Sequence, residues 1–310
     1  MDGGIVTAAL AATLVAGTPL ILAALGELVT ERSGVLNLGI EGMMAIGAVA
    51  AFAIAHHTGS AVLGALAGVG AGALMAGLFG ILALTLSANQ VASGLALSIF
   101  GVGLSAFVGK SYESIALPGV PTVPIPYLAA IPVLGHAVFD QQVVVYLSWG
   151  LFAAIVGFLY RSRMGLILRA VGESPVSAHS IGYRVIAIRY LATLFGGAMS
   201  GLAGAFLSVF YTPVWVEGMV AGRGWIALAL VVFATWRPLR VLLGAYLFGG
   251  VMIAQLFVQG SGAQIEIPSQ LLTSLPYLAT IIVLVVISRD PKAIRLNSPA
   301  SLGQPFRPDG

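Results

Sequence analysis

Long apolar runs separated by short polar intervals dominate this sequence. A bilayer core of about 30 Å requires about 20 apolar residues to be crossed by one helix. By that measure the sequence predicts membrane spans near residues 5–26, 38–57, 61–86, 90–109, 142–160, 190–211, 224–236, 240–258 and 270–288. The seventh of these is short, so the expected count is about nine. The predicted fold is all-α: a polytopic transmembrane helical bundle.

One polar interval, residues 161–189, is long and basic. It carries Arg161, Arg163, Arg169, Glu173, Arg184 and Arg189. A single charge at the bilayer centre costs roughly 2.5–3.5 kcal/mol on insertion scales, so these six residues cannot lie in lipid. Helix-to-helix connections that only reverse direction usually need about 2–8 residues. We therefore interpret this loop as a docking surface; the alternative is an ordinary connector.

Within that loop the sequence predicts one short helix of about two turns. Ser174 can cap the first free amides, and Pro175 suits the first helical position because its nitrogen has no proton to satisfy. Gly182 can adopt the left-handed conformation that closes a helix.

Two polar breaks interrupt the apolar pattern. Residues 26–42 are too polar for a lipid-facing helix, and irregular backbone at membrane depth requires protein or a water-filled cavity around it. We predict an interrupted helix lining an interior path, with Asn37 and Glu41 as path residues; a plain cytoplasmic turn is the alternative. The second break, residues 87–90, is uncharged, and Asn89 and Gln90 either line the same path or hydrogen-bond between helices.

Glycines repeat at four-residue spacing at Gly64, Gly68 and Gly72, and again at Gly197 and Gly201. In membranes, small residues let helix backbones approach closely. These runs therefore predict tight helix crossings rather than phosphate-binding loops.

The composition agrees with a membrane protein: 59% of the residues are hydrophobic and 8% are charged. A soluble domain usually has about 25% charged residues. The net charge of +3 does not indicate nucleic acid, because the basic residues gather at span ends and in a few loops. If residues 161–189 are cytoplasmic, all Lys and Arg residues except Lys110 and Arg223 fall on the cytoplasmic side. This predicts an external N-terminus and a cytoplasmic C-terminus.

The sequence shows no recognisable catalytic or metal-binding motif. There is no cysteine, the four histidines lack zinc-binding spacing, and Lys110 lacks the glycine spacing of a phosphate-binding loop. We expect no enzyme activity, no metal and no cofactor. Glu27, Glu31 and Glu41, clustered in the first polar break, are the sole candidates for carboxylates inside the membrane. They leave an ion-coupled secondary carrier of a small polar solute, working without an ATPase, as the alternative function.

Three stretches resemble a known family: GELVTERSGVLNLGIEGMMAIGA (26–48), ANQVASGLALSIFGVGL (88–104) and MGLILRAVGESPVSAHSIGY (164–183). They are similar to the ABC-importer permeases for branched-chain amino acids, ribose-type sugars and nucleosides, closest to the simple-sugar and nucleoside branch. The resemblance covers about residues 20–288. It implies a type II-like importer permease of the bacterial inner membrane that forms the translocation path for nucleosides or simple sugars.

The same resemblance implies partners and roles. The partners would be a cytoplasmic ABC ATPase, a second permease that is often a paralogue, and an extracytoplasmic substrate-binding protein. The ATPase-coupling residues would be Arg169, Glu173, Ser174, Ala178 and Gly182. Residues 1–288 would form the transmembrane permease domain, and residues 289–310 a flexible cytoplasmic tail.

Overall fold

The computed structural model describes residues 3–129, 131, 134–260, 274–275, 278, 281–282, 285 and 297–307. Most of these residues are helical. The helices are α1 (Gly3–Arg32), α2 (Ile40–Thr58), α3 (Ala61–Gly80), α4 (Gln90–Gly109), α5 (Leu134–Phe139), α6 (Val143–Arg161), α7 (Arg163–Glu173), α8 (Pro175–Ser180), α9 (Val185–Ala205), α10 (Arg223–Phe233) and α11 (Pro238–Gly260). Short π-helical segments extend α3 (Ile81–Thr85) and α9 (Phe206–Tyr211), and a 3-10 turn (Lys110–Tyr112) extends α4.

Seven helices of the described residues are long and apolar enough to cross a membrane. They are Val6–Arg32, Ile40–Thr58, Ala61–Thr85, Gln90–Tyr112, Val143–Arg161, Val185–Tyr211 and Pro238–Phe257. The predicted span at 224–236 is instead the 11-residue helix α10, too short to cross a bilayer alone. The predicted span at 270–288 lies largely outside the described residues. The polytopic helical fold is confirmed, whereas the count of about nine is not.

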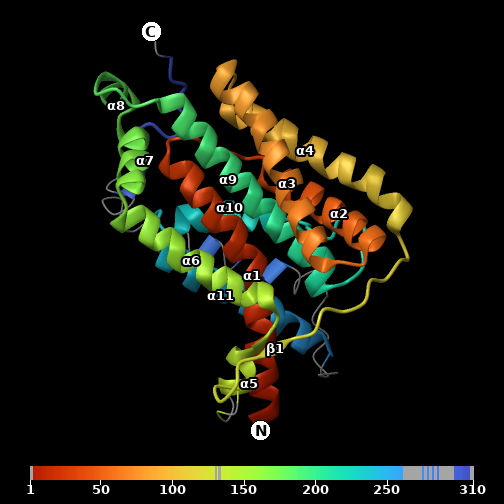
Figure 1. Cartoon of the computed structure of the whole chain (residues 1–310). Helices are drawn as coiled ribbons and strands as arrows, with labels where there is room; N and C mark the ends of the chain where they lie inside the picture. The colour runs from red at the N-terminus through yellow and green to blue at the C-terminus, as the bar shows by residue number, and fades with distance from the viewer. Residues whose placement is uncertain are drawn as a thin grey trace.

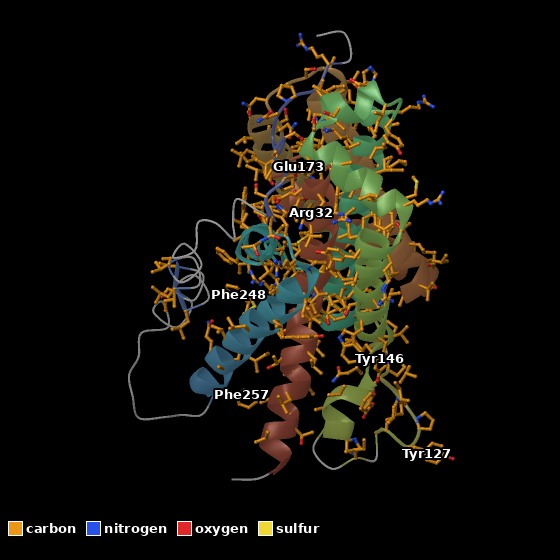
Figure 2. The ribbon with its side chains drawn as sticks, turned by 90° about the vertical axis from the view of Figure 1, so that its left-hand side faces the viewer. Arg32, Tyr127, Tyr146, Glu173, Phe248 and Phe257 are labelled. Atoms are coloured by element: carbon orange, nitrogen blue, oxygen red, sulfur yellow. The ribbon has the colours of Figure 1, made fainter. Side chains whose placement is uncertain are left out.

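The two ends of the bundle carry different segments (Figure 1). The helices α7 and α8 and the C-terminus lie at one end, and the N-terminus, α5 and β1 (Val123–Pro124) lie at the other. In Figure 2, Glu173 and Arg32 lie in the upper half of the view, and Tyr127 lies near the bottom. We call the end with α7 and α8 the loop end. The polar interval 161–189 and residues 297–307 thus share one end, as the distribution of basic residues predicts.

Helix α9 packs against α1, α2 and α3 and lies at the centre of the core. Its crossing with α3 depends on glycine: a Cβ on Gly72 would lie 2.2 Å from the carbonyl oxygen of Gly197, and one on Gly201 would lie 2.1 Å from that of Gly68. No side chain fits at such separations. The predicted small-residue crossing is therefore confirmed, and it joins the two glycine runs to each other.

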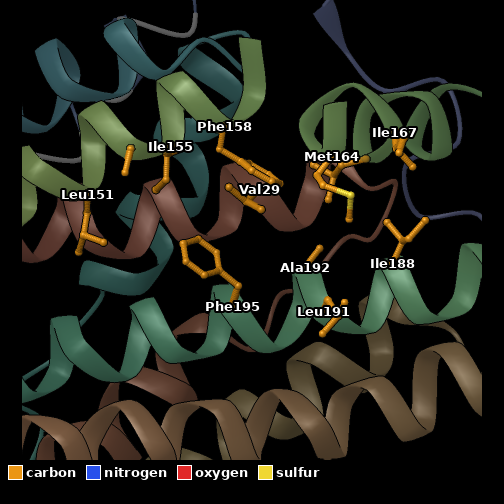
Figure 3. A pocket seen from close by; sticks show the side chains of 12 residues that line it. Val29, Leu151, Ile155, Phe158, Met164, Ile167, Ile188, Leu191, Ala192 and Phe195 are labelled. Atoms are coloured by element: carbon orange, nitrogen blue, oxygen red, sulfur yellow. The ribbon is translucent and has the colours of Figure 1, made fainter. Parts of the chain in front are cut away.

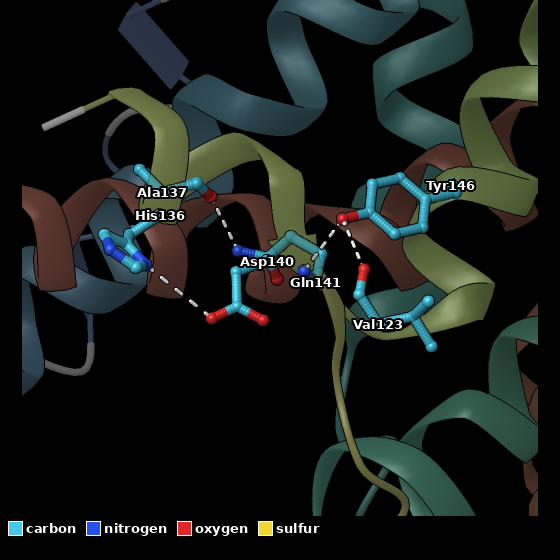
Figure 4. Close-up of polar contacts among 6 residues, drawn as sticks. All are labelled: Val123, His136, Ala137, Asp140, Gln141 and Tyr146. Atoms are coloured by element: carbon cyan, nitrogen blue, oxygen red, sulfur yellow. Dashed lines mark hydrogen bonds and ion pairs between the residues drawn. The ribbon is translucent and has the colours of Figure 1, made fainter. Parts of the chain in front are cut away.

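The segment between α4 and α6 folds back at the N-terminal end of the bundle. A short antiparallel pair joins β1 to β2 (Asp140–Gln141). As Figure 4 shows, the Tyr146 hydroxyl accepts a hydrogen bond from the Gln141 amide and donates one to the Val123 carbonyl oxygen, at 3.0 and 3.2 Å. His136 lies 3.8 Å from Asp140 in the same cap. This proline-rich segment is therefore tied together by its own polar contacts.

The C-terminal residues 297–307, part of the predicted tail, form hydrogen bonds with the loop end. The Ser301 amide donates to the Gly172 carbonyl oxygen at 3.0 Å, and the Gly303 amide donates to that of Gly34 at 3.1 Å. Ser301 itself is buried. These residues pack against the loop end because short polar groups of the tail satisfy backbone groups there. The predicted flexibility of residues 289–310 and the domain boundary at 288 both stay predictions.

Candidate functional site

The link between α1 and α2, residues 33–39, is buried and non-helical. Its free amides are satisfied by side chains from other elements. The Asn37 amide donates to the Glu27 carboxylate at 3.2 Å, and the Leu36 amide donates to the Gln90 side-chain oxygen at 2.8 Å. The Asn37 side chain accepts from the Gly39 amide at 2.9 Å, an Asx turn that leads into α2. The plain-turn alternative does not describe this link, because it is buried and cross-connected.

Glu41, on the first turn of α2, holds the beginning of α10. Its two carboxylate oxygens accept hydrogen bonds from the amides of Gly222 and Gly224, each at 2.7 Å. The first amides of a helix lack intrahelical partners and carry partial positive charge. A carboxylate is therefore a favourable partner for this helix end. Gly222 has a φ of 81°, a left-handed conformation that glycine adopts readily.

The other end of α10 is held by α1. The indole nitrogen of Trp236 donates to the Glu31 carboxylate, and Arg32 donates to the Trp236 carbonyl oxygen at 2.8 Å. Glu31 and Glu41 therefore fix the two ends of the same short helix. The stretch ERSGVLNLGIEG at 31–42 thus supplies the carboxylates that hold both ends of the short helix α10. Its sequence did not reveal this role.

A small cavity lies beside Glu41, between α2, α4 and the segment before α10. It has a volume of about 90 Å³ and is lined by Glu41, Ser105 and Trp215 together with apolar side chains. The indole nitrogen of Trp215 is buried and has no hydrogen-bond partner in the described structure. The cavity lining is therefore mainly apolar, and Glu41, Ser105 and Trp215 add a carboxylate, a hydroxyl and an aromatic ring beside the N-terminus of α10.

The four predicted path residues occupy different positions. Glu41 lines the cavity, Asn37 is buried in the link between α1 and α2, and Gln90 is buried at the start of α4, with its side chain bonded to that link. Asn89 is exposed and caps α4, accepting a hydrogen bond from the Ala92 amide at 3.0 Å. Gln90 thus joins the two predicted polar breaks to each other, and Asn89 lies outside this cluster.

The short helix expected in the polar loop is present as α8, Pro175–Ser180. The Ser174 hydroxyl accepts from the Ser177 amide, Pro175 occupies the first turn, and Gly182 has a φ of 93°. Ala178 is buried against neighbouring apolar side chains, whereas Glu173 is exposed. All three local predictions for this helix are confirmed.

The helix preceding α8 was not predicted. Helix α7 spans 11 residues, Arg163–Glu173, and is capped by the Ser162 side chain, which accepts from the Gly165 amide at 2.9 Å. Arg169 projects from it over the ring of Tyr160, 5.4 Å from the centroid. The loop is thus two consecutive helices.

Arg189 is a buried cation that sequence reasoning assigned to the loop surface. It is 1% exposed and lies within the apolar helix α9. Its guanidinium donates to the Ser33 carbonyl oxygen at 3.2 Å, to the Gln304 carbonyl oxygen at 3.0 Å and to the Ser301 hydroxyl at 3.0 Å. Two of the three partners lie more than a hundred residues away in the tail, so no local pattern identifies them.

A larger hollow on the flank of the bundle is apolar throughout (Figure 3). It measures about 390 Å³ and lies between α1, α6, α7 and α9, with Phe158, Met164 and Phe195 among its lining side chains. No polar side chain lines it, so its lining side chains offer a polar solute no hydrogen bond. The cavity beside Glu41, which has a carboxylate and a hydroxyl in its lining, is the better candidate for such a solute.

Comparison with known protein families decides the class of this chain. Residues 9–287 match the model of the permease component of branched-chain amino acid transport systems. The chain belongs to this permease family. The ion-coupled carrier alternative is therefore set aside, and the buried carboxylates of α1 and α2 have structural partners in Asn37, Trp236 and α10.

Individual relatives of the permease cover nearly its whole length. It is 40% identical to the ABC transporter permease protein TsgC13 of Haloferax volcanii over 95% of this chain and 96% of the relative. It is 34% identical to the guanosine ABC transporter permease protein NupQ of Bacillus subtilis, over 88% of this chain and 89% of NupQ. It is 32% identical to the nucleoside ABC transporter permease protein NupC of Lactococcus lactis, over 88% and 90%. No solved structure matches the permease.

Proposed function

We propose that this permease is one membrane subunit of an ATP-driven importer and that its solute is a nucleoside or a simple sugar. The observation that carries the proposal is the full-length similarity to TsgC13, whose name refers to glucose, and to NupQ and NupC, which are named for guanosine and nucleosides. These solutes share a ring that carries several hydroxyl groups. A path with a carboxylate, a hydroxyl and an indole suits that chemistry.

The second permease subunit is proposed to be a paralogue rather than a second copy. Two further relatives, NupP of Bacillus subtilis and TsgB13 of Haloferax volcanii, are 27% and 23% identical to this chain. In each of those organisms the chain is more similar to one permease, NupQ or TsgC13, than to the other. We infer that it corresponds to NupQ and TsgC13, and that its partner resembles NupP or TsgB13.

The translocation path is proposed to run past the N-terminus of α10. Helix α10 begins beside Glu41 and ends beside Glu31, so it occupies only part of the membrane thickness. In many transporters the substrate site is formed by discontinuous helices, and irregular backbone at membrane depth is tolerated where it lines a cavity. The cavity of about 90 Å³ is small for a whole nucleoside, which fits a path completed by the second permease.

Coupling to the ATPase is assigned to α8 and the residues around it. Arg169, Glu173, Ser174, Ala178 and Gly182 are the proposed coupling residues. The support is a capped helix at the loop end that exposes Val176, with Ile181 exposed directly after the helix, at 66% and 72%. Exposed apolar side chains on so short a helix suit a partner surface. The permease is proposed to lie in the inner membrane with this end in the cytoplasm. The N-terminus is then external and the C-terminus is cytoplasmic.

The test is purification of the tagged chain from its own membrane, followed by uptake assays in proteoliposomes with the co-purified subunits. We expect an ATPase and a paralogous permease to co-purify, and radiolabelled guanosine or glucose to enter only with ATP and the binding protein. A chain that purifies alone and transports without ATP contradicts the proposal.

Single substitutions test the site assignments within that assay. Glu173→Arg is expected to uncouple ATP hydrolysis from uptake while membrane insertion stays normal. For the path, Asn37→Leu and Asn89→Leu are compared with the unmodified protein. Normal transport kinetics in both variants would make these two residues packing and capping residues and leave Glu41 as the path residue.

A further inference from the structure

The C-terminal segment 297–307, which we call the strap, ties three parts of the loop end together. Ser301 donates through both its amide and its hydroxyl to the Gly172 carbonyl oxygen at the end of α7, at 3.0 and 2.7 Å. The Gly303 amide donates to the Gly34 carbonyl oxygen in the link between α1 and α2, at 3.1 Å. Arg32 donates to the Asn297 carbonyl oxygen at 2.9 Å. Arg189 adds bonds from α9 to Ser301 and Gln304. The strap is therefore fixed by hydrogen bonds at several points along its length.

The far part of the strap supports α8. Phe306 packs beside Ala178 and Val185, and its ring lies edge-on to that of His179, 5.7 Å between centroids. Arg307 extends to the loop between α3 and α4, where its guanidinium lies 3.4 Å from the Ser87 hydroxyl oxygen. The inner side of α8 therefore rests on the strap rather than on a membrane-spanning helix alone.

The strap and α8 together enclose a groove of about 550 Å³. One wall is formed by the start of α8 and the other by the strap, with Glu173 and Arg307 supplying opposite charges. The other lining residues that matter here are Val176 on α8 and Gln304 and Phe306 on the strap. The mixture of charge, hydroxyl and apolar surface is typical of a protein interface and unlike a lipid-facing surface.

We propose that the strap is part of the ATPase-docking surface and that a segment of the ATPase lies in the groove between the strap and α8. This inference rests on the proposed function, in which α8 faces the ATPase. The exposed side chain of Val176 on α8 is itself part of the groove wall, so a partner that covers this side chain also reaches the strap. The two opposite charges fit a partner segment that carries both an acidic and a basic side chain.

Cross-linking tests the proposal directly, because the chain contains no cysteine of its own. Single cysteines are introduced as Val176→Cys on α8, Gln304→Cys on the strap and Tyr127→Cys at the opposite end of the bundle (Figure 2). The assembled importer in native membranes is treated with a short cross-linker that joins a thiol to an amine. We expect Val176→Cys and Gln304→Cys to capture the ATPase, and Tyr127→Cys to capture none.

The outcomes separate the two proposals. If Val176→Cys captures the ATPase and Gln304→Cys does not, the strap is not part of the docking surface, while the coupling role of α8 stands. If neither position captures it, both assignments are overturned.

A substitution that spares the core gives a second measurement. Phe306→Ala removes the support under α8, and Phe257→Ala removes an exposed ring of the same size from α11. We expect Phe306→Ala to weaken ATPase binding to the permease pair about tenfold, the size of one important interface contact, and Phe257→Ala to leave it unchanged. Equal ATPase affinity in the two variants, with equal amounts of folded protein, contradicts the proposal.

Discussion

The carboxylate of Glu41 accepts a hydrogen bond from the backbone amide of Gly224, which lies 183 positions further along the chain. A Cβ at Gly224 would lie 2.6 Å from a Glu41 carboxylate oxygen, so only glycine permits this approach. The first turn of α2 thereby sets where α10 begins. Because the same carboxylate borders the cavity of about 90 Å³, the position of α10 and the shape of this cavity depend on one residue.

Glu41→Gln should loosen this junction. The amide side chain keeps one acceptor oxygen, so one of the two backbone amides loses its partner and meets an N–H group instead. Hydrogen bonds to charged groups contribute about 1.5–3 kcal/mol, and we expect a loss of stability of that order. The midpoint of thermal unfolding of the purified protein in detergent measures it, and solute uptake should fall with it.

Glu217→Gln is the matched control for this change. Glu217 lies in the segment before α10, but it is exposed. The Glu217→Gln substitution should therefore leave both the unfolding midpoint and solute uptake unchanged. If the two variants behave alike, the Glu41 carboxylate does not hold α10.

The crossing of α3 and α9 makes a sharp prediction about two neighbouring glycines. Gly72→Ala places a methyl group 2.2 Å from the Gly197 carbonyl oxygen, whereas the Cβ of Gly70→Ala meets nothing within 4 Å. The first substitution should push the two helices apart and sharply reduce the yield of folded protein. The second should be neutral or stabilise by about 0.5–1 kcal/mol, since alanine favours a helix more than glycine does. Size-exclusion profiles and unfolding midpoints of both variants test this, and similar values for the two would contradict the packing.

Local sequence signals predicted the parts of the structure that depend on local chemistry. The caps of α8 follow from the preferences of Ser174, Pro175 and Gly182 for particular helix positions, and the structure has all three as expected. The glycine faces of α3 and α9 follow from four-residue spacing. The long spans follow from apolar length.

Features built by distant residues were missed. Arg189 looked like one more loop cation, and its partners Ser301 and Gln304 lie beyond a further hundred residues of chain. Glu41 was predicted to line a path, but its hold on α10 requires two glycines from another element. The short helix α10 looked like a weak span because apolar content does not reveal that both its ends are held by carboxylates inside the bundle.

Asn89 separates a capping role from a path role. Its side chain accepts from the Ala92 amide at the start of α4, and an N-cap residue replaced by alanine usually costs about 1 kcal/mol. We expect Asn89→Ala to lower stability by about that amount, and Asn89→Asp to retain it because aspartate caps equally well. Unfolding midpoints of both variants measure the capping role, and uptake by Asn89→Asp measures a role in the path. If Asn89→Asp retains stability but loses uptake, Asn89 contacts the solute and is more than a cap.

The last prediction compares two glycines that share a conformation but lie at opposite ends of the bundle. Gly182 follows α8 with a φ of 93°, and Gly59 ends α2 with a φ of 68°; a Cβ would meet nothing within 4 Å at either position. A β-branched side chain disfavours the left-handed region by about 1–2 kcal/mol, so Gly182→Val and Gly59→Val should lower stability similarly. Only Gly182→Val alters the end of α8, so it alone should reduce the solute imported per ATP hydrolysed in proteoliposomes. If both variants import the same amount of solute per ATP hydrolysed, strain at the end of α8 has no more effect than strain at the end of α2. That result would remove α8 from the coupling mechanism.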